Sequence, residues 1–332
     1  MLERPFFVMG CPRSGTTLLQ LMLHAHPRLA VPPETRFLLP TYESRLRFGD
    51  LGREDNRRDL ARWIVARKAT RFYDLGLDAD QMTERIAGGP PTLGSALHAV
   101  YQGYAARFDK PRWGEKRPGY IRYVGVLRRL FPDAQFVHLV RDGRDCVASL
   151  LEMSWWPYGV RHAVATWAQA VDDGRRAARS LPVGTYHELR YESLVSDPER
   201  ELRALCGFLG EEYDPAMAEP SRVAAQAVPR RKRWHSRTRQ ELTATRFGSW
   251  RERLDPADVA LCETALGGRL TACGYELSGA PAPSAAELLK YSEVVTRRKL
   301  AERKWRAGDA LRRMREPNPV ARVGEGYPRG VP

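Results

Sequence analysis

The feature that most constrains this chain is a glycine-containing loop that joins a short apolar run to an amphipathic segment. The apolar run covers residues 5–10, and apolar residues recur at helical spacing from Leu18 to Leu23, which predicts a strand, a loop and a helix. Backbone N–H groups at such a helix start converge on an anion. A tight turn that only satisfies its own backbone groups is the alternative. The loop reads Gly10-Cys11-Pro12-Arg13-Ser14-Gly15-Thr16-Thr17.

The loop departs from the nucleotide-triphosphatase loop at one position. In the pattern G-x-x-x-x-G-K-[ST], the Lys reaches the β- and γ-phosphates beside a metal. Here Thr16 stands in place of that Lys, and Arg13 is the only cation of the loop. The loop therefore suggests a ligand with a terminal phosphate or phosphosulfate and no obligatory Mg²⁺.

Strand and helix candidates alternate along the rest of the chain. Residues 135–140 and 184–189 have the pattern of buried strands, and helical patterns follow them over 143–153 and 198–209. This alternation predicts an α/β fold with a central parallel sheet and helices on both faces. Residues 43–110 are polar and charged with apolar patches at helical spacing, so we expect a helical insertion there.

A second group of residues suits a phosphate monoester. The run from Phe136 to Asp145 puts Arg141 at the carboxyl end of a strand and Ser149 in the following helix. Ligands of open α/β sheets bind at that edge, and a guanidinium donates two parallel hydrogen bonds to phosphate oxygens. An ion pair of Arg141 with Asp142 or Asp145 is the alternative.

Together these motifs resemble those of sulfotransferases that use 3′-phosphoadenosine 5′-phosphosulfate (PAPS), over roughly residues 5–277. Residues 12–19 resemble the family's 5′-phosphosulfate loop, and Arg141 with Ser149 resembles its 3′-phosphate site. The likeness is greatest to the tyrosylprotein branch and its bacterial relatives, on the motifs His26-Pro27, Glu34-Thr35-Arg36-Phe37 and Gly114-Glu115-Lys116-Arg117-Pro118. Arg117 stands where the family usually has Thr, which we interpret as acceptor tuning.

The resemblance implies a P-loop-type sulfotransferase fold and an enzyme that moves the sulfuryl group from PAPS to an acceptor hydroxyl and releases 3′-phosphoadenosine 5′-phosphate (PAP). It implies that Glu34 is the general base, a role that a carboxylate can fill. A helix cap or an ion pair with Arg36 is the alternative for Glu34. His24 and His26 are alternative bases, although His26 before Pro27 is more simply a helix end.

The resemblance also assigns the remaining site residues. Lys116 and Arg13 would stabilise the sulfuryl group and the leaving phosphate. Tyr191 would lie near the 3′-phosphate or the adenine, with core packing as its alternative, and Arg246 with the Gly248 backbone would close over the 3′-phosphate. The loop residues expected to hold the 5′-phosphate are Arg13, Ser14, Gly15, Thr16 and Thr17.

Composition narrows the classes of partner. The chain has 54 Lys and Arg against 40 Asp and Glu, a net charge of +14, with basic runs over residues 222–253 and 287–316. Such runs form either a solvated surface or a field that attracts an anionic substrate. The sequence has no zinc-finger spacing, RNA-recognition signature or basic zipper, so we do not expect nucleic acid as a main ligand.

Two further absences bear on cofactors and location. The five cysteines are scattered without a C-x-x-C pair, which argues against a disulfide framework and a zinc site, so we expect no metal. No apolar run is long enough to span a membrane, and the first residues do not form a secretory signal. We therefore expect a cytoplasmic protein with no transmembrane segment.

The expected organisation is a sulfotransferase domain over 1–278, with the insertion on the acceptor side, a linker over 279–286, a basic helix over 287–316 and a tail over 317–332. The helix would dock either on the body of its own chain or, in a homo-oligomer, on a second copy.

The acceptor is expected to be a hydroxyl on a carbohydrate, a glycolipid or a small natural product, ahead of a peptide tyrosine. Residues 43–110 and the run Trp-Trp-Pro-Tyr over 155–158 are apolar and aromatic enough to line its pocket. The basic run over 222–239 would instead favour an acidic acceptor. Two other functions remain: a small-molecule kinase on the same loop scaffold, and a non-catalytic PAP-binding protein that uses the basic helix.

Overall fold

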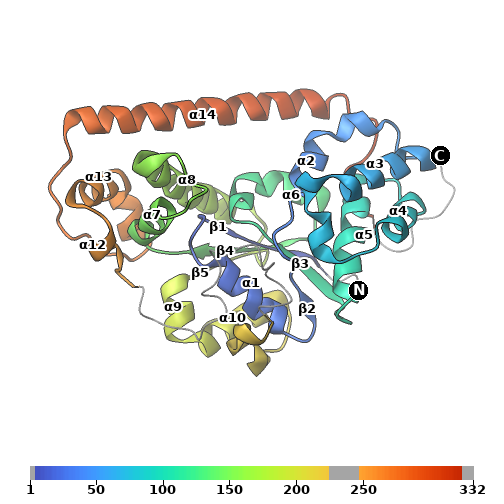
Figure 1. Ribbon diagram of the computed structural model, residues 1–332, viewed down its shortest axis with the longest axis horizontal. Coiled ribbons are helices and arrows are strands. Elements are labelled where there is room, and N and C mark those ends of the chain that lie inside the picture. The colour runs from blue at the N-terminus through green and yellow to red at the C-terminus, as the bar shows by residue number, and fades with distance from the viewer. Residues whose placement is uncertain (1–3, 224–246, 324–332) are drawn as a thin grey trace.

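A computed structural model of the chain describes residues 4–223 and 247–323. Its centre is a parallel sheet with the strand order β2-β3-β1-β4-β5 (Figure 1), which confirms the predicted α/β fold. Because β1 lies between β3 and β4, the carboxyl ends of these three strands meet at one edge of the sheet. The strands are β1 (Phe6–Gly10), β2 (Leu29–Ala30), β3 (Arg112–Lys116), β4 (Gln135–Val140) and β5 (Tyr186–Arg190).

Helices surround the sheet, and a 3₁₀ turn over Pro118–Tyr123 follows β3. The helices are α1 (Thr16–Ala25), α2 (Leu38–Glu43), α3 (Glu54–Ala66), α4 (Ala79–Ala87), α5 (Leu93–Ala106), α6 (Val124–Leu130), α7 (Gly143–Leu151), α8 (Gly159–Ser180), α9 (Tyr191–Ser196), α10 (Pro198–Leu209), α12 (Trp250–Arg253), α13 (Pro256–Ala272) and α14 (Ala285–Arg313). Within the described residues, no helix has both the length and the apolar character that crossing a membrane requires.

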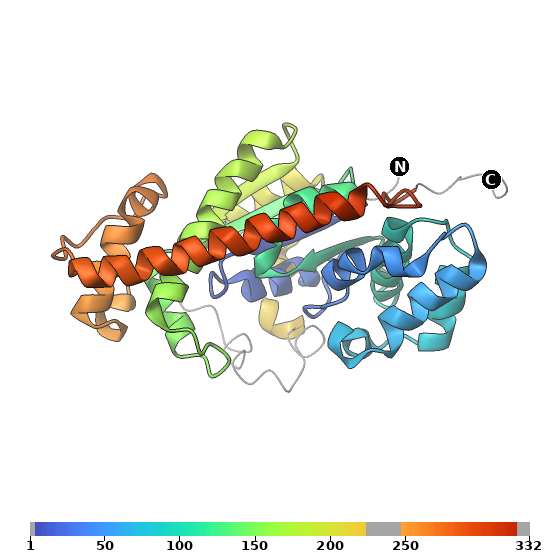
Figure 2. The same ribbon diagram turned by 90° about the horizontal axis from the view of Figure 1, so that it is seen from above.

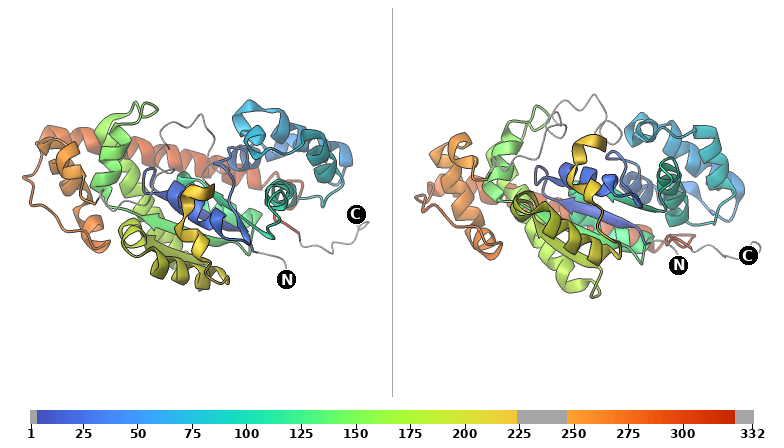
Figure 3. Two further views of the ribbon diagram at one scale, coloured as in Figure 1. Left: turned by 60° about the horizontal axis from the view of Figure 1, so that its bottom comes forward. Right: turned by 90° about the horizontal axis from the view of Figure 1, so that it is seen from below.

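Side chains of β1 alternate between two apolar clusters, because successive residues of a strand point to opposite faces. Phe6 and Val8 belong to the cluster that contains Leu23 of α1. Phe7 and Met9 belong to the cluster that contains Trp167 of α8. Helices therefore cover both faces of the sheet, as the sequence predicts, with α1, α9 and α10 on one face and α8 on the other (Figure 3).

Strand β3 was not among the predicted strands. It reads Arg-Trp-Gly-Glu-Lys, yet all five residues are buried. The guanidinium of Arg112 donates to the Gln135 side chain at 2.5 Å and to the Leu209 carbonyl at 2.6 Å, and a Cβ at Gly114 would lie 2.3 Å from the Phe6 ring. The polar residues of β3 obtain their partners from distant segments, so its sequence lacks the apolar run that identifies the other central strands.

The C-terminal helix α14 docks on its own chain. It crosses α8 and reaches α2 (Figure 2). An ion pair of 2.6 Å joins Arg161 to Glu287, and the Trp305 indole donates to Glu43 at 2.8 Å. The helix begins at Ala285, inside the expected linker, because Ser284 caps its first turn. The expected insertion contains α3, α4 and α5.

Candidate active site

The phosphate loop follows β1 and starts α1. Gly15 has φ 95°, and a Cβ there would lie 2.3 Å from the Tyr191 ring, so the position requires glycine. Arg13 also has a positive φ, 73°, a strained conformation of the kind found at ligand sites. The Ser14 hydroxyl is buried and has no hydrogen-bond partner among the described residues. A buried hydroxyl without a partner beside a helix start fits a bound phosphate oxygen.

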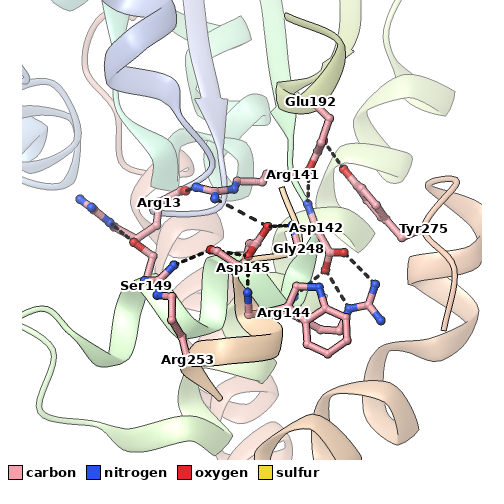
Figure 4. Close-up of polar contacts among 12 residues, drawn as sticks. Arg13, Arg141, Asp142, Arg144, Asp145, Ser149, Glu192, Gly248, Arg253 and Tyr275 are labelled. Atoms are coloured by element: carbon pink, nitrogen blue, oxygen red, sulfur yellow. Dashed lines mark hydrogen bonds and ion pairs between the residues drawn. The ribbon is translucent and has the colours of Figure 1, made fainter. Parts of the chain in front are cut away.

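Arg13, Arg141 and Ser149 meet on the β4 side of this loop (Figure 4). The Arg13 Nε donates to Ser149 Oγ at 3.0 Å, and Arg141 Nη1 donates to the Arg13 carbonyl at 3.2 Å. The Arg141 guanidinium lies 4.6 Å from the centre of the Tyr191 ring. Burial, together with the charge of Arg141, lowers the pKa of Arg13. Two guanidinium groups gathered in a buried site favour an anion.

Asp145, at the start of α7, organises the segment that contains Gly248. Its carboxylate accepts the Gly248 N–H at 3.1 Å, the Ser249 hydroxyl at 3.0 Å and the Trp250 N–H at 2.9 Å. Arg141 Nη2 lies 3.7 Å from the same carboxylate, so the ion pair considered as the alternative for Arg141 is present. Asp145 thereby holds Gly248 beside Arg141. Arg246 lies outside the described residues.

A second network holds the end of β4 in place. Asp142 accepts the Arg144 N–H at 2.9 Å and pairs with its guanidinium at 2.7 Å, and Arg144 reaches Glu263 at 2.6 Å. Glu192 accepts the Asp142 N–H at 3.0 Å and the Tyr275 hydroxyl at 2.9 Å. The sequence analysis did not predict these contacts, because their partners come from α9, α13 and the segment after α13.

Lys116 and Glu34 meet on the β3 side of the loop. The Lys116 side chain is 2% exposed, and its Nζ lies 3.4 Å from Glu34 Oε2 and 3.4 Å from Thr17 Oγ1. Lys116 is the last residue of β3, so the strand directs its ammonium toward the start of α1. The Glu34 side chain is 21% exposed, so its carboxylate is more open to solvent than the Lys116 ammonium.

Glu115 is a buried carboxyl that the sequence analysis did not single out. Its Oε1 accepts the Thr35 N–H at 3.3 Å and the Thr35 hydroxyl at 3.0 Å, and this hydroxyl is 3.1 Å from Tyr101. Burial raises the pKa of Glu115 to about 8, and the nearby charge of Glu34 adds to the shift. Residues 34–35 and 115–116 are thus joined twice, by Lys116 to Glu34 and by Thr35 to Glu115.

The two histidines considered as bases are both buried and bonded to backbone near the end of α1. His24 Nδ1 accepts the Val31 N–H at 3.1 Å, and burial lowers the pKa of His24 to about 3, with the charge of Lys110 adding to the effect. His26 Nδ1 accepts the Arg28 N–H at 3.1 Å, and its other nitrogen donates to the Glu212 carbonyl at 2.8 Å. These contacts support a structural role for both rings.

A cavity of about 380 Å³ lies beside the phosphate loop. Trp156, Tyr158 and His162 form a chain of ring contacts along it, with centroid distances of 5.2 and 5.6 Å. The sequence analysis named the first two of these, whereas Trp155 is not part of the lining. The lining residues are Gly10, Pro12, Gly119, Ile121, Arg122, Trp156, Tyr158, His162, Thr166, Ala170 and Arg298.

No group of three or more His, Cys, Asp or Glu residues in the described ranges is arranged to bind a metal ion.

The model of the sulfotransferase family matches residues 5–215. The chain belongs to this family. Protein-tyrosine sulfotransferase 2 of Gallus gallus is 30% identical over 219 residues, which are 61% of this chain and 50% of that protein. The nodulation protein NoeE of Sinorhizobium fredii is 28% identical over 230 residues, 63% of this chain and 50% of that protein. The chain thus spans about half the length of these relatives.

A solved structure has the same fold. The sulfotransferase domain of the Synechococcus PCC 7002 olefin synthase superposes with a TM-score of 0.58 at 23% identity, covering 82% of this chain and 96% of that domain. The sulfotransferase fold is therefore confirmed. The family match ends at residue 215, so α13 and α14 lie beyond it.

Proposed function

We propose that this chain transfers the sulfuryl group of PAPS to an acceptor hydroxyl and releases PAP. One observation carries the proposal: the phosphate loop after β1 has Arg141 and Ser149 on its β4 side and Lys116 with Glu34 on its β3 side. The cations on the β4 side suit the phosphates of the donor. The Glu34 carboxylate on the β3 side suits the proton of an acceptor hydroxyl.

The donor would be held by the loop and by the end of β4. The buried Ser14 hydroxyl, the Gly15 turn, Thr16 and Thr17 would hold the 5′-phosphate. For the 3′-phosphate we propose Arg141, Ser149, Gly248 and Arg246, with Tyr191 against the same group. PAPS, when bound, supplies an activated sulfuryl group whose transfer needs positioning and charge stabilisation more than covalent help.

Glu34 is the proposed general base, which takes the proton of the acceptor hydroxyl. The Lys116 ammonium, 3.4 Å away, would orient this carboxylate and stabilise charge on the reacting group. Arg13, which hydrogen-bonds Ser149, would neutralise charge along the phosphates from the β4 side. A pKa of about 3 and a bonded Nδ1 argue against His24 as the base.

The proposed acceptor is a hydroxyl on a carbohydrate, a glycolipid or a small natural product, ahead of a peptide tyrosine. The aromatic wall of the cavity beside Pro12 supports an acceptor that carries a sugar or a ring, because Trp and Tyr faces bind both. A cytoplasmic location and a contact between two copies through α14 also stay predictions.

The donor assignment is tested by thermal denaturation with PAP, ADP and ATP with Mg²⁺. A ligand at about 100 times its Kd adds roughly 2.7 kcal/mol, enough to raise the midpoint by several degrees. We expect PAP to stabilise the wild type more than ADP, Arg141→Ala to lose that preference, and Arg62→Ala, a change of an exposed arginine, to keep it. Greater stabilisation by ATP with Mg²⁺ would favour the kinase alternative.

A further inference from the structure

Two arginines from distant segments line the cavity beside the phosphate loop. Arg122 belongs to the 3₁₀ turn after β3, and Arg298 belongs to α14, which Figure 2 shows lying across α8. Arg298 donates to the Gln169 side chain at 2.7 Å. Within the described residues, neither guanidinium forms an ion pair with a carboxylate. The C-terminal helix therefore brings a second positive charge to a cavity whose other lining residues lie within residues 5–215, the part that matches the family model.

The positive charges of Arg122 and Arg298 repel each other. Burial lowers the pKa of Arg298, and the charge of Arg122 lowers it further. Asp173 acts on both arginines at longer range, but its carboxylate pairs with Arg176 at 2.9 Å and does not line the cavity. Among the described residues, no Asp or Glu lines the cavity, so the cavity wall itself carries positive charge, which Asp173 offsets from outside the lining.

Aromatic rings form another part of the cavity lining. The rings of Trp156, Tyr158 and His162 pack edge to face or tilted along the cavity, and Gly10 and Pro12 of the phosphate loop also line it. A ligand that satisfies this cavity needs an anion for the two guanidinium groups and a flat apolar body for the rings.

We propose that the cavity binds the acceptor through an anionic group, and that Arg122 and Arg298 together hold a carboxylate on an aromatic hydroxyl compound. This inference rests on the proposed function and names its substrate class. An anion between two guanidinium groups relieves their mutual repulsion and forms charge-assisted hydrogen bonds. Since α14 lies beyond the family match, the acceptor preference of this chain depends on its own C-terminal helix.

The test compares two probes of nearly equal size, 4-hydroxyphenylacetate and its uncharged amide, by calorimetric titration of the full chain with and without saturating PAP. We expect the wild type to bind the carboxylate roughly tenfold or more tightly than the amide. Arg122→Met and Arg298→Met keep an apolar stem and should lose this preference. The matched control is Arg297→Met, because Arg297 is 77% exposed and pairs with Glu293; it should keep the preference.

Equal affinity for the two probes, no detectable binding of the carboxylate, or a preference that survives in both variants would overturn the inference. The midpoint shift with PAP, measured on every variant, shows that the fold and the donor site are intact. A wild type that prefers the carboxylate but does not bind PAP would support the anion site and overturn the proposed function, so the two failures are distinguishable.

Discussion

The ammonium of Lys116 lies 3.4 Å from the carboxylate of Glu34 and is almost wholly buried. A buried ammonium without a partner would be costly, so this pair holds the end of β3 against the segment that follows β2. The neighbouring contact, from Thr35 to Glu115, fixes the backbone that follows Glu34. Strand β3 thus holds Glu34 through Lys116 and the next residue, Thr35, through Glu115.

Replacing the candidate base should abolish most of the turnover. We expect Glu34→Gln to lower kcat for PAP formation about 10²–10⁴-fold, the range that general-base catalysis contributes. Its midpoint shift with PAP should stay at the wild-type value, because the donor site does not include Glu34. Sulfation at the wild-type rate would remove Glu34 from the mechanism and revive the search for another base.

Asp145→Asn should loosen the segment around Gly248. In the wild type, both oxygens of the Asp145 carboxylate accept hydrogen bonds, three in all, and the carboxylate faces Arg141. The amide of the variant keeps only one acceptor oxygen and carries no charge. We expect the free energy of unfolding in urea to fall by roughly 1–3 kcal/mol and PAP to bind more weakly. Asp59→Asn, which alters an exposed carboxylate, serves as the control and should change neither quantity measurably.

Gly15→Ala should disrupt the phosphate loop. The new Cβ would meet the Tyr191 ring at 2.3 Å in a backbone with φ 95°. We therefore expect the free energy of unfolding to fall by roughly 1–3 kcal/mol and PAP binding to be lost. Gly207→Ala is the matched control. It lies within α10 with open space around its Cβ, and it should stabilise the protein by about 0.5–1 kcal/mol.

Glu115 should make the stability fall with rising pH. Burial raises the pKa of its carboxyl in the folded state from 4.5 to about 8, so between these values the folded protein holds a proton that the unfolded chain has released. The free energy of unfolding should therefore decline as the pH rises from about 4.5 to about 8.

The comparison that isolates this effect is urea unfolding of the wild type and Glu115→Gln across the same pH range. The amide cannot ionise, so its stability relative to the wild type should increase with pH. Glu199→Gln, a change of an exposed side chain, should leave the pH dependence as it is. Parallel curves for the wild type and Glu115→Gln would contradict the assignment of the shift.

The sequence by itself predicted the parts of this protein that local patterns encode. The apolar runs of β1, β4 and β5 alternate with helical spacing, and the loop from Gly10 to Thr17 carries its own turn and anion chemistry. The apolar positions of α8 also repeat at helical spacing (Ala163, Val164, Trp167 and Val171), so that helix could have been predicted in the same way.

The tertiary structure alone decided which distant residues satisfy one another. Glu115 and Arg112 read as surface residues of a polar stretch, but they are buried because Thr35, Gln135 and Leu209 supply their hydrogen bonds. Arg298 reads as one cation of a charged helix, and only the docking of α14 on α8 brings it to the cavity. Local patterns specify strands, turns and helices; partners for buried polar groups come from contacts between segments far apart in the chain.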